Sequence, residues 1–270
     1  MAELDKFPFA EVQAEGIRAD WSAWHPSICA QSDLKLLTRL DSAPPETTVA
    51  ATLFLRSDSK EERAERKAWP KRLLDFTGLK CLWINGCTPE LFESIGQLRS
   101  LLRLSIVRGR VSNLDGLNRL SALTHFYYCG SPKLANLDPI GETSSLIGLT
   151  LVGNFENVRS LEPLGSLSRL ESLCLGANDF CQNSYESFAP VGKLRKLRDL
   201  SIFSTKVSRD GLFPVGELQN LEYLCLATGQ LKFWSVQEYQ HLHERLPKLK
   251  TNLLELAATD REFQKEHKIR

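Results

Sequence analysis

The hexad Leu-x-x-Leu-x-Leu, with isoleucine or an aromatic residue at some of its leucine positions, recurs seven times and begins at Leu79, Leu101, Leu123, Leu146, Leu170, Leu197 and Leu221. Successive hexads begin 22, 22, 23, 24, 27 and 24 residues apart. One strand of this kind has an apolar side that it cannot bury alone, so stacked copies must bury it together. The near-constant period therefore predicts a solenoid of strand-and-return units.

A second phrase lies in the segments between hexads, as Leu114-Asp115-Gly116-Leu117, Leu137-Asp138-Pro139-Ile140, Leu161-Glu162-Pro163-Leu164 and Phe213-Pro214-Val215-Gly216. Proline and glycine disfavour a long helix and favour a single tight turn. Asn154 and Asn178 each follow the last hexad leucine by three residues. We expect these two side chains to point inward and to hydrogen-bond the backbone of the turn.

Together these features resemble the short-unit, internalin-like class of leucine-rich repeat proteins over roughly residues 73–230. The resemblance implies an α/β solenoid in the shape of a horseshoe. Its parallel β-sheet would form the concave face, and short turns or 3-10 segments would form the convex face. An array exposes apolar ends, so caps are expected at residues 1–72 and 231–270. Residues 179–185 make the fifth unit long and are expected to bulge from it.

The N-terminal cap contains three candidate elements. Ser32 precedes an apolar pattern that ends at Leu40 and predicts a short helix with Ser32 as its N-cap. Residues 49–55 are rich in strand formers and predict an edge strand of the sheet. Residues 59–67 predict a charged helix that Pro70 stops.

The C-terminal cap carries a clear helix signal. Ser235 and Glu238 have the spacing of a capping box, in which each residue satisfies a backbone donor of the other. The helix is expected to end at Arg245, just before Pro247. Residues 259–270 are mostly polar and are expected to fray.

Composition excludes several classes of protein. Of the 270 residues, 42% are hydrophobic and 25% charged, which argues against disorder, and the net charge of +1 gives no general attraction to nucleic acid. No apolar run reaches the roughly 18–20 residues needed to span a membrane, and the N-terminus lacks the features of a signal peptide. Seven cysteines without a Cys-x-x-Cys pair favour free thiols in a reducing cytosol. We therefore expect a cytoplasmic protein.

Strand side chains alternate between two faces, so the hexad pattern also predicts the surface of the sheet. Positions four and six should face the core, whereas positions three, five and the next residue should face outward on the concave side. The middle of that side has small residues, and its ends have large ones. The first end is made basic by Lys80, Arg103 and Arg108, and the second is made acidic by Glu171, Asp199 and Glu222. The candidate partner-binding residues are Trp83, Arg103, Ser105, His125, Tyr127, Thr150, Asp199, Phe203 and Tyr223.

This surface is predicted to be an exposed trough that receives a protruding element of a partner, because aromatic residues and arginine dominate binding energy at protein interfaces. A structural alternative stays open. Strands favour aromatic residues for packing alone, and the N-terminal cap could cover Trp83.

No catalytic, metal or cofactor site is expected. His125 and Cys129 lie four residues apart on one strand, or about 13 Å, which is beyond hydrogen-bond reach. His241 and His243 lie on diverging sides of the predicted C-terminal helix. No glycine-rich phosphate loop occurs.

The sequence thus predicts a non-enzymatic module that binds a protein partner, with no nucleic acid or membrane, and that is a monomer in isolation. The favoured version is a cytosolic immunity or inhibitor protein that neutralises a toxin or enzyme. The alternatives are a target-selecting adaptor or secreted effector of a pathogen and, last, an enzyme whose site lies in residues 1–72. Fold alone does not decide among them.

Overall fold

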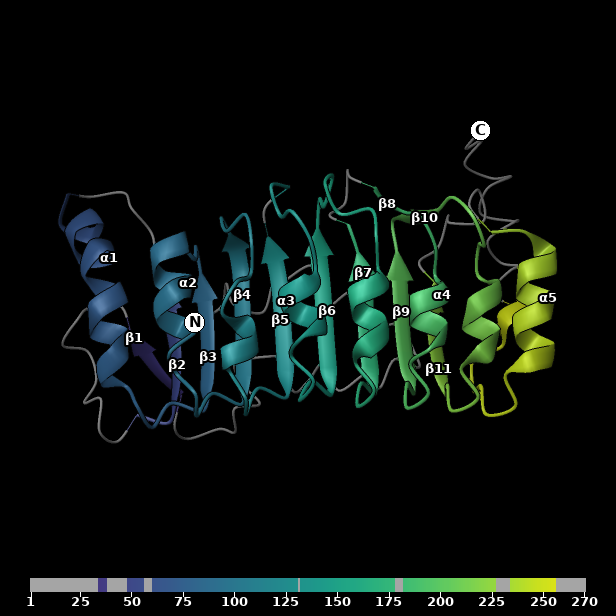
Figure 1. The fold of residues 1–270 in the computed structure, drawn as a ribbon, viewed down its shortest axis with the longest axis horizontal. Helices are drawn as coiled ribbons and strands as arrows, with labels where there is room; N and C mark the ends of the chain where they lie inside the picture. The colour runs from purple at the N-terminus through teal and green to yellow at the C-terminus, as the bar shows by residue number, and fades with distance from the viewer. Residues whose placement is uncertain are drawn as a thin grey trace.

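The computed structural model describes residues 34–37, 48–55, 60–130, 132–177, 182–226 and 234–255. Within these ranges nine strands form one open, parallel sheet in the order β1-β2-β3-β4-β5-β6-β7-β9-β11 (Figure 1). The strands are β1 (Leu34–Leu37), β2 (Ala50–Phe54), β3 (Cys81–Asn85), β4 (Arg103–Gly109), β5 (His125–Gly130), β6 (Gly148–Gly153), β7 (Ser172–Gly176), β9 (Asp199–Phe203) and β11 (Tyr223–Leu226).

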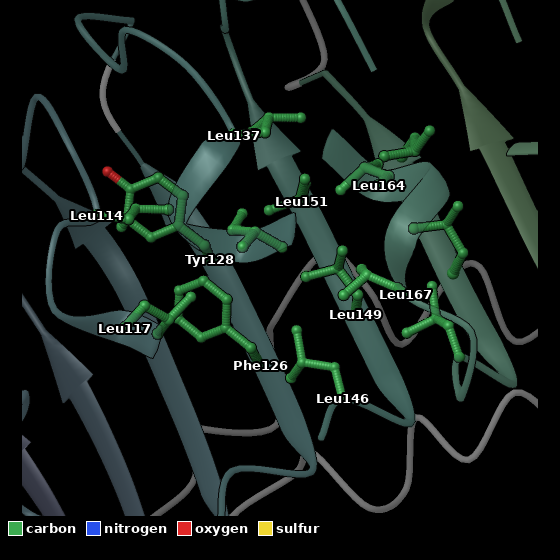
Figure 2. Packing of buried hydrophobic residues seen from close by; sticks show 14 of the residues in the cluster. Leu114, Leu117, Phe126, Tyr128, Leu137, Leu146, Leu149, Leu151, Leu164 and Leu167 are labelled. Carbon is green, nitrogen blue, oxygen red and sulfur yellow. The ribbon is translucent and has the colours of Figure 1, made fainter. Parts of the chain in front are cut away.

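The predicted hexad phase is confirmed. Position four of each hexad pairs in register with position four of the next, as in Phe126 with Leu149 and Leu149 with Leu173. These side chains are almost fully buried. Figure 2 shows Phe126, Tyr128, Leu149 and Leu151 projecting from β5 and β6 toward leucines of the return segments. The core therefore lies between the sheet and the returns, as stacked repeats require.

The returns form a second layer, which covers one face of the sheet (Figure 1). They contain α1 (Lys60–Arg72), η3 (Leu73–Asp75), α2 (Pro89–Ile95), η4 (Leu117–Arg119), α3 (Asp138–Gly141), η5 (Glu162–Ser166), α4 (Ala189–Gly192), η6 (Phe213–Glu217) and α5 (Val236–Arg245). The elements η4, α3, η5, α4 and η6 have three to five residues each, so the predicted tight turns are confirmed. Proline is the second residue of four of them, because its fixed φ suits the first turn of a helix.

Neighbouring returns are packed through contacts between the glycine of one unit and the proline of the next. A Cβ added at Gly141 would lie 2.4 Å from the carbonyl oxygen of Pro163. The equivalent contact between Gly192 and Pro214 would measure 2.6 Å. We call these the glycine–proline contacts. They bring successive returns closer together than any side chain at the glycine would allow.

The asparagine that points inward and bonds the backbone is not one of the two predicted residues. Asn154 donates to the Glu156 carboxylate on the surface, so the prediction for Asn154 is wrong; Asn178 lies outside the described residues. Asn183 instead is buried, donates to the carbonyls of Gly153 and Gly176, and accepts from the backbone N–H of Phe155. It begins β8 (Asn183–Tyr185), which pairs in parallel with β10 (Thr205–Val207).

Part of the predicted 179–185 bulge is therefore a strand. Residues 183–185 belong to β8, and residues 179–181 lie outside the described residues. The extra length of this unit includes Asn183, which makes backbone hydrogen bonds of the kind expected of Asn154.

The caps confirm some predictions and correct others. Residues 34–37 form a strand, not the predicted helix, because β2 offers them a parallel partner. The rest of that predicted helix, up to Leu40, lies outside the described residues. The strand predicted at residues 49–55 is present as β2, but β1 lies outside it, so β2 is not the edge. Pro70 does not stop α1, which continues to Arg72 with buried Trp69 packed 6.4 Å from the ring of Phe76.

The C-terminal helix α5 has the predicted capping box and the predicted end. Tyr239 and Leu242 are buried on one face of α5. The Glu238 side chain does more than cap. It also accepts the backbone N–H of Leu212 at 2.9 Å and so ties the cap to the sixth unit.

Candidate partner-binding face

The side of the sheet opposite the returns carries three columns of side chains, as predicted. The fifth-position column runs in register from Trp83 through Ser105, Tyr127 and Thr150. These four residues are only 8%, 7%, 6% and 2% exposed, so their expected exposure is wrong. Strands about 4.8 Å apart place each side chain between two neighbours of its own column, which shield it.

The remaining predicted site residues, Arg103, His125, Asp199, Phe203 and Tyr223, are partly exposed. Phe203 also contradicts the prediction that the middle of the concave side is open. A Cβ added at Gly176 would lie 2.1 Å from the Phe203 ring, so the space that Gly176 leaves is filled by an aromatic side chain from the next strand. The trough is therefore not continuous along the sheet.

A depression of about 470 Å³ lies where β5, β6, β7, β9 and β11 begin, and it is lined by His125, Ile147, Gly148, Glu171, Ser172, Arg198, Asp199, Glu222, Tyr223 and Lys250. Three of the predicted site residues belong to this lining: His125, Asp199 and Tyr223. The small residues Gly148 and Ser172 leave the room between them. The other predicted residues do not line it.

One wall of the depression is an ionic cluster. Glu222 accepts Arg198 Nη2 at 2.6 Å on one oxygen and Lys250 Nζ at 2.6 Å on the other. Hydrogen bonds from Lys250 and then Arg198 lower the pKa of the Glu222 carboxyl. Lys250 Nζ also lies 4.8 Å from the centre of the Tyr223 ring and donates to its hydroxyl. The Tyr223 side chain is thereby held in place.

The sequence predicts an acidic second end, and this prediction is incomplete. Glu171, Asp199 and Glu222 are there, but Arg198 and Lys250 lie among them. Arg198 directly precedes the predicted Asp199, so charge alternation at the second hexad position is a signal that could have found it. Lys250 follows Glu222 by 28 residues, across the cap helix, and no repeat spacing predicts its position.

The thiols of this face are poorly suited to chemistry. Burial raises the pKa of Cys174 well above its usual value and that of Cys225 to about 11. Both thiols are therefore protonated near neutral pH and weak as nucleophiles. In the described part of the chain, no group of three or more His, Cys, Asp or Glu side chains is placed to hold a metal ion. Nor does any described helix have the length and apolarity to cross a membrane.

The repeated hexads, the parallel sheet and the layer of short returns define the class of the protein: it is a leucine-rich repeat solenoid with an open sheet. No protein-family profile matches the chain, and no curated protein matches its sequence.

Solved structures that resemble it include internalins. An internalin from Listeria monocytogenes is 15% identical with a TM-score of 0.49, and 74% of this chain aligns with 59% of that one. Internalin C2 from the same bacterium is 25% identical with a TM-score of 0.46, and 58% of this chain aligns with 65%. A leucine-rich repeat protein from Leptospira interrogans is 17% identical with a TM-score of 0.41, and 74% aligns with 54%. The chain thus spans less than two thirds of each.

Proposed function

We propose that the chain is a non-enzymatic module that binds a protein partner at the depression of its sheet face. The observation that carries this proposal is the depression itself, because side chains of successive units build it on a rigid sheet. Its polar rim and its aromatic Tyr223 have the residue types that recur at protein interfaces. The raised pKa values of the Cys174 and Cys225 thiols make these two groups unsuited to nucleophilic catalysis.

The ionic cluster supports the same proposal through preorganisation. Two bases on one carboxylate fix the side chains of Glu222 and Lys250, and Lys250 fixes Tyr223. Side chains that are already ordered lose little conformational entropy when a partner binds. A partner that contacts Tyr223 would therefore gain more net free energy than it would from a mobile aromatic side chain.

The test is quantitative affinity capture from a lysate of the source organism, followed by binding assays with the protein identified. The double variant Tyr223→Ala/Lys250→Ala should lose about 1–3 kcal/mol of binding free energy, or about 5- to 150-fold in affinity. The control is Phe213→Ala, because Phe213 is 46% exposed in η6 on the opposite layer. Equal affinity of wild type and the double variant would contradict a site at the depression.

A finer version of the proposal is a cytoplasmic immunity or inhibitor protein that neutralises a toxin or enzyme. A depression with ordered charged walls suits the capping of a protruding element near an active site. The captured partner decides this version directly. Inhibition of its activity by equimolar wild-type chain, but not by the double variant, is the expected result; undiminished activity in a saturated complex would favour an adaptor or effector.

A further inference from the structure

The second-position residues of the last four hexads and one residue of the C-terminal cap form a regular row along the edge of the depression. We call it the charge row: Ile147, Glu171, Arg198, Glu222 and, from the C-terminal cap, Lys250. Each of the last four donates its backbone N–H to the carbonyl oxygen of the residue before it in the row, at 2.8 Å in every case. The row therefore continues the spacing of the sheet, about 4.8 Å per step.

Charges alternate along the charge row, but the alternation is broken at one end. Glu222 has a base on each side and is ion-paired with both. Glu171 has Arg198 on one side and apolar Ile147 on the other. Among the ion pairs between described residues, none includes Glu171. The position where the next base would stand is the part of the depression next to Ile147 and Gly148.

The depression as a whole also has more acidic than basic side chains in its described lining. Its described lining holds three carboxylates, on Glu171, Asp199 and Glu222, and two permanent bases, Arg198 and Lys250. Both bases are bonded to Glu222. The carboxylate of Glu171 thus faces the hollow without a cation of the charge row on its open side, and opposite charge there lowers the electrostatic energy.

We propose that the depression receives a cationic side chain, lysine or arginine, from the protein partner. Its charged end would lie at Glu171, and its methylene stem would lie along partly buried Ile147, since long basic side chains cover apolar surface in this way. Gly148 leaves space for the stem, and the hydroxyl of Ser172 is an acceptor for the donors of the head group. The inference rests on the proposed function, which it deepens by naming the chemistry of the anchor residue.

The test uses blocked tripeptides as probes, in which glycine flanks arginine, lysine, glutamine or glutamate. Each is titrated into the isotopically labelled full chain at low ionic strength, and the backbone amide signals of Gly148 and Ser172 are followed by NMR. We expect saturable shifts with the arginine and lysine peptides only. Saturation by the glutamate peptide at equal or lower concentration, or no saturable shift with either cationic peptide, would overturn the proposal.

A matched pair of variants locates the charge. Glu171→Gln should weaken binding of the cationic peptides about 1.4- to five-fold, the range that corresponds to exposed ion pairs. Glu93→Gln removes an exposed carboxylate from α2, in the opposite layer, and should leave binding unchanged. Glu171 is itself exposed, so neither change threatens folding, which thermal melting would verify.

Failure here is distinguishable from failure of the proposed function. A captured protein partner that is lost with Tyr223→Ala/Lys250→Ala but indifferent to Glu171→Gln would leave the binding site standing and refute the cationic anchor. Loss of the partner with Glu171→Gln, together with selective peptide binding, would support both.

Discussion

The glycine–proline contacts predict a stability difference between two substitutions that look alike in sequence. Gly141 and Gly165 both follow a proline by two residues in a short return helix, and neither has a positive φ. A Cβ at Gly141 would lie 2.4 Å from the Pro163 carbonyl oxygen, whereas a Cβ at Gly165 would lie 3.3 Å from the Pro190 carbonyl oxygen. Ordinary contacts begin near 3.4 Å, so Gly141→Ala demands a shift of about 1 Å between two units and Gly165→Ala almost none.

The magnitude follows from two opposing terms. Overpacking against a backbone atom that cannot rotate away costs about 1–3 kcal/mol. Replacing glycine by alanine restricts the unfolded chain and returns about 0.4–1 kcal/mol. We therefore expect Gly141→Ala to lower the free energy of unfolding by about 1–2 kcal/mol, and Gly165→Ala to change it by less than about 0.5 kcal/mol.

Urea denaturation followed by circular dichroism gives the free energy of unfolding of both variants and wild type under one condition. The expected change for Gly141→Ala corresponds to a melting temperature about 2–8 °C lower. Equal stability of the two variants would refute the argument, because the distance to the next unit is the main difference between them. Gly192→Ala, with a 2.6 Å contact, should resemble Gly141→Ala.

Three other predictions concern the core, the long unit and the ionic cluster. Leu149→Ala removes a fully buried core side chain and should cost about 2–5 kcal/mol in denaturant unfolding; unchanged stability would mean that the hexad phase is wrong. Asn183→Ala leaves three backbone groups without their partner and should cost about 2–4 kcal/mol, whereas Asn154→Ala, on the surface, should be near neutral by the same assay. Because the folded-state pKa of Glu222 is lowered, its contribution to stability is present above the ordinary value of 4.5 and is lost as the pH falls through the lowered one. Melting curves against pH should therefore show Glu222→Gln less stable than wild type near neutrality and equal to it in acid; a constant gap would contradict the shift.

The sequence predicts the repeated part of the molecule well because two periods agree there. Leucines at every unit length fix the stacking, and alternation within each hexad fixes which side chains enter the core, so residues such as Leu149 and Tyr128 are assigned to the correct face. The capping box of Ser235 and Glu238 is equally local, and α5 begins where it predicts.

Prediction from the sequence fails where the structure of a segment depends on residues of the same chain that are far away in sequence. Residues 34–37 form a strand because β2 is beside them, which no local pattern states. The sequence places Tyr127 on the correct face of the sheet, but it does not predict that Tyr127 is buried, because the side chains of neighbouring strands decide its burial. The lining of the depression is predicted only in part. Alternation along the strands predicts Asp199 and Tyr223, whereas Lys250 belongs to the C-terminal cap and is not predicted by it.

Asn183 has a consequence for attempts to build regular arrays from this chain. A designer who averages the units would delete the extra residues of the fifth as an irregularity, since insertions in repeats are usually dispensable. Here that deletion would remove the side chain that bonds Gly153, Phe155 and Gly176 at once. The averaged sequence would keep asparagine at position 154, but in this chain that side chain faces the surface and bonds Glu156. Regularising the length would therefore weaken the array unless the neighbouring units were redesigned together with it.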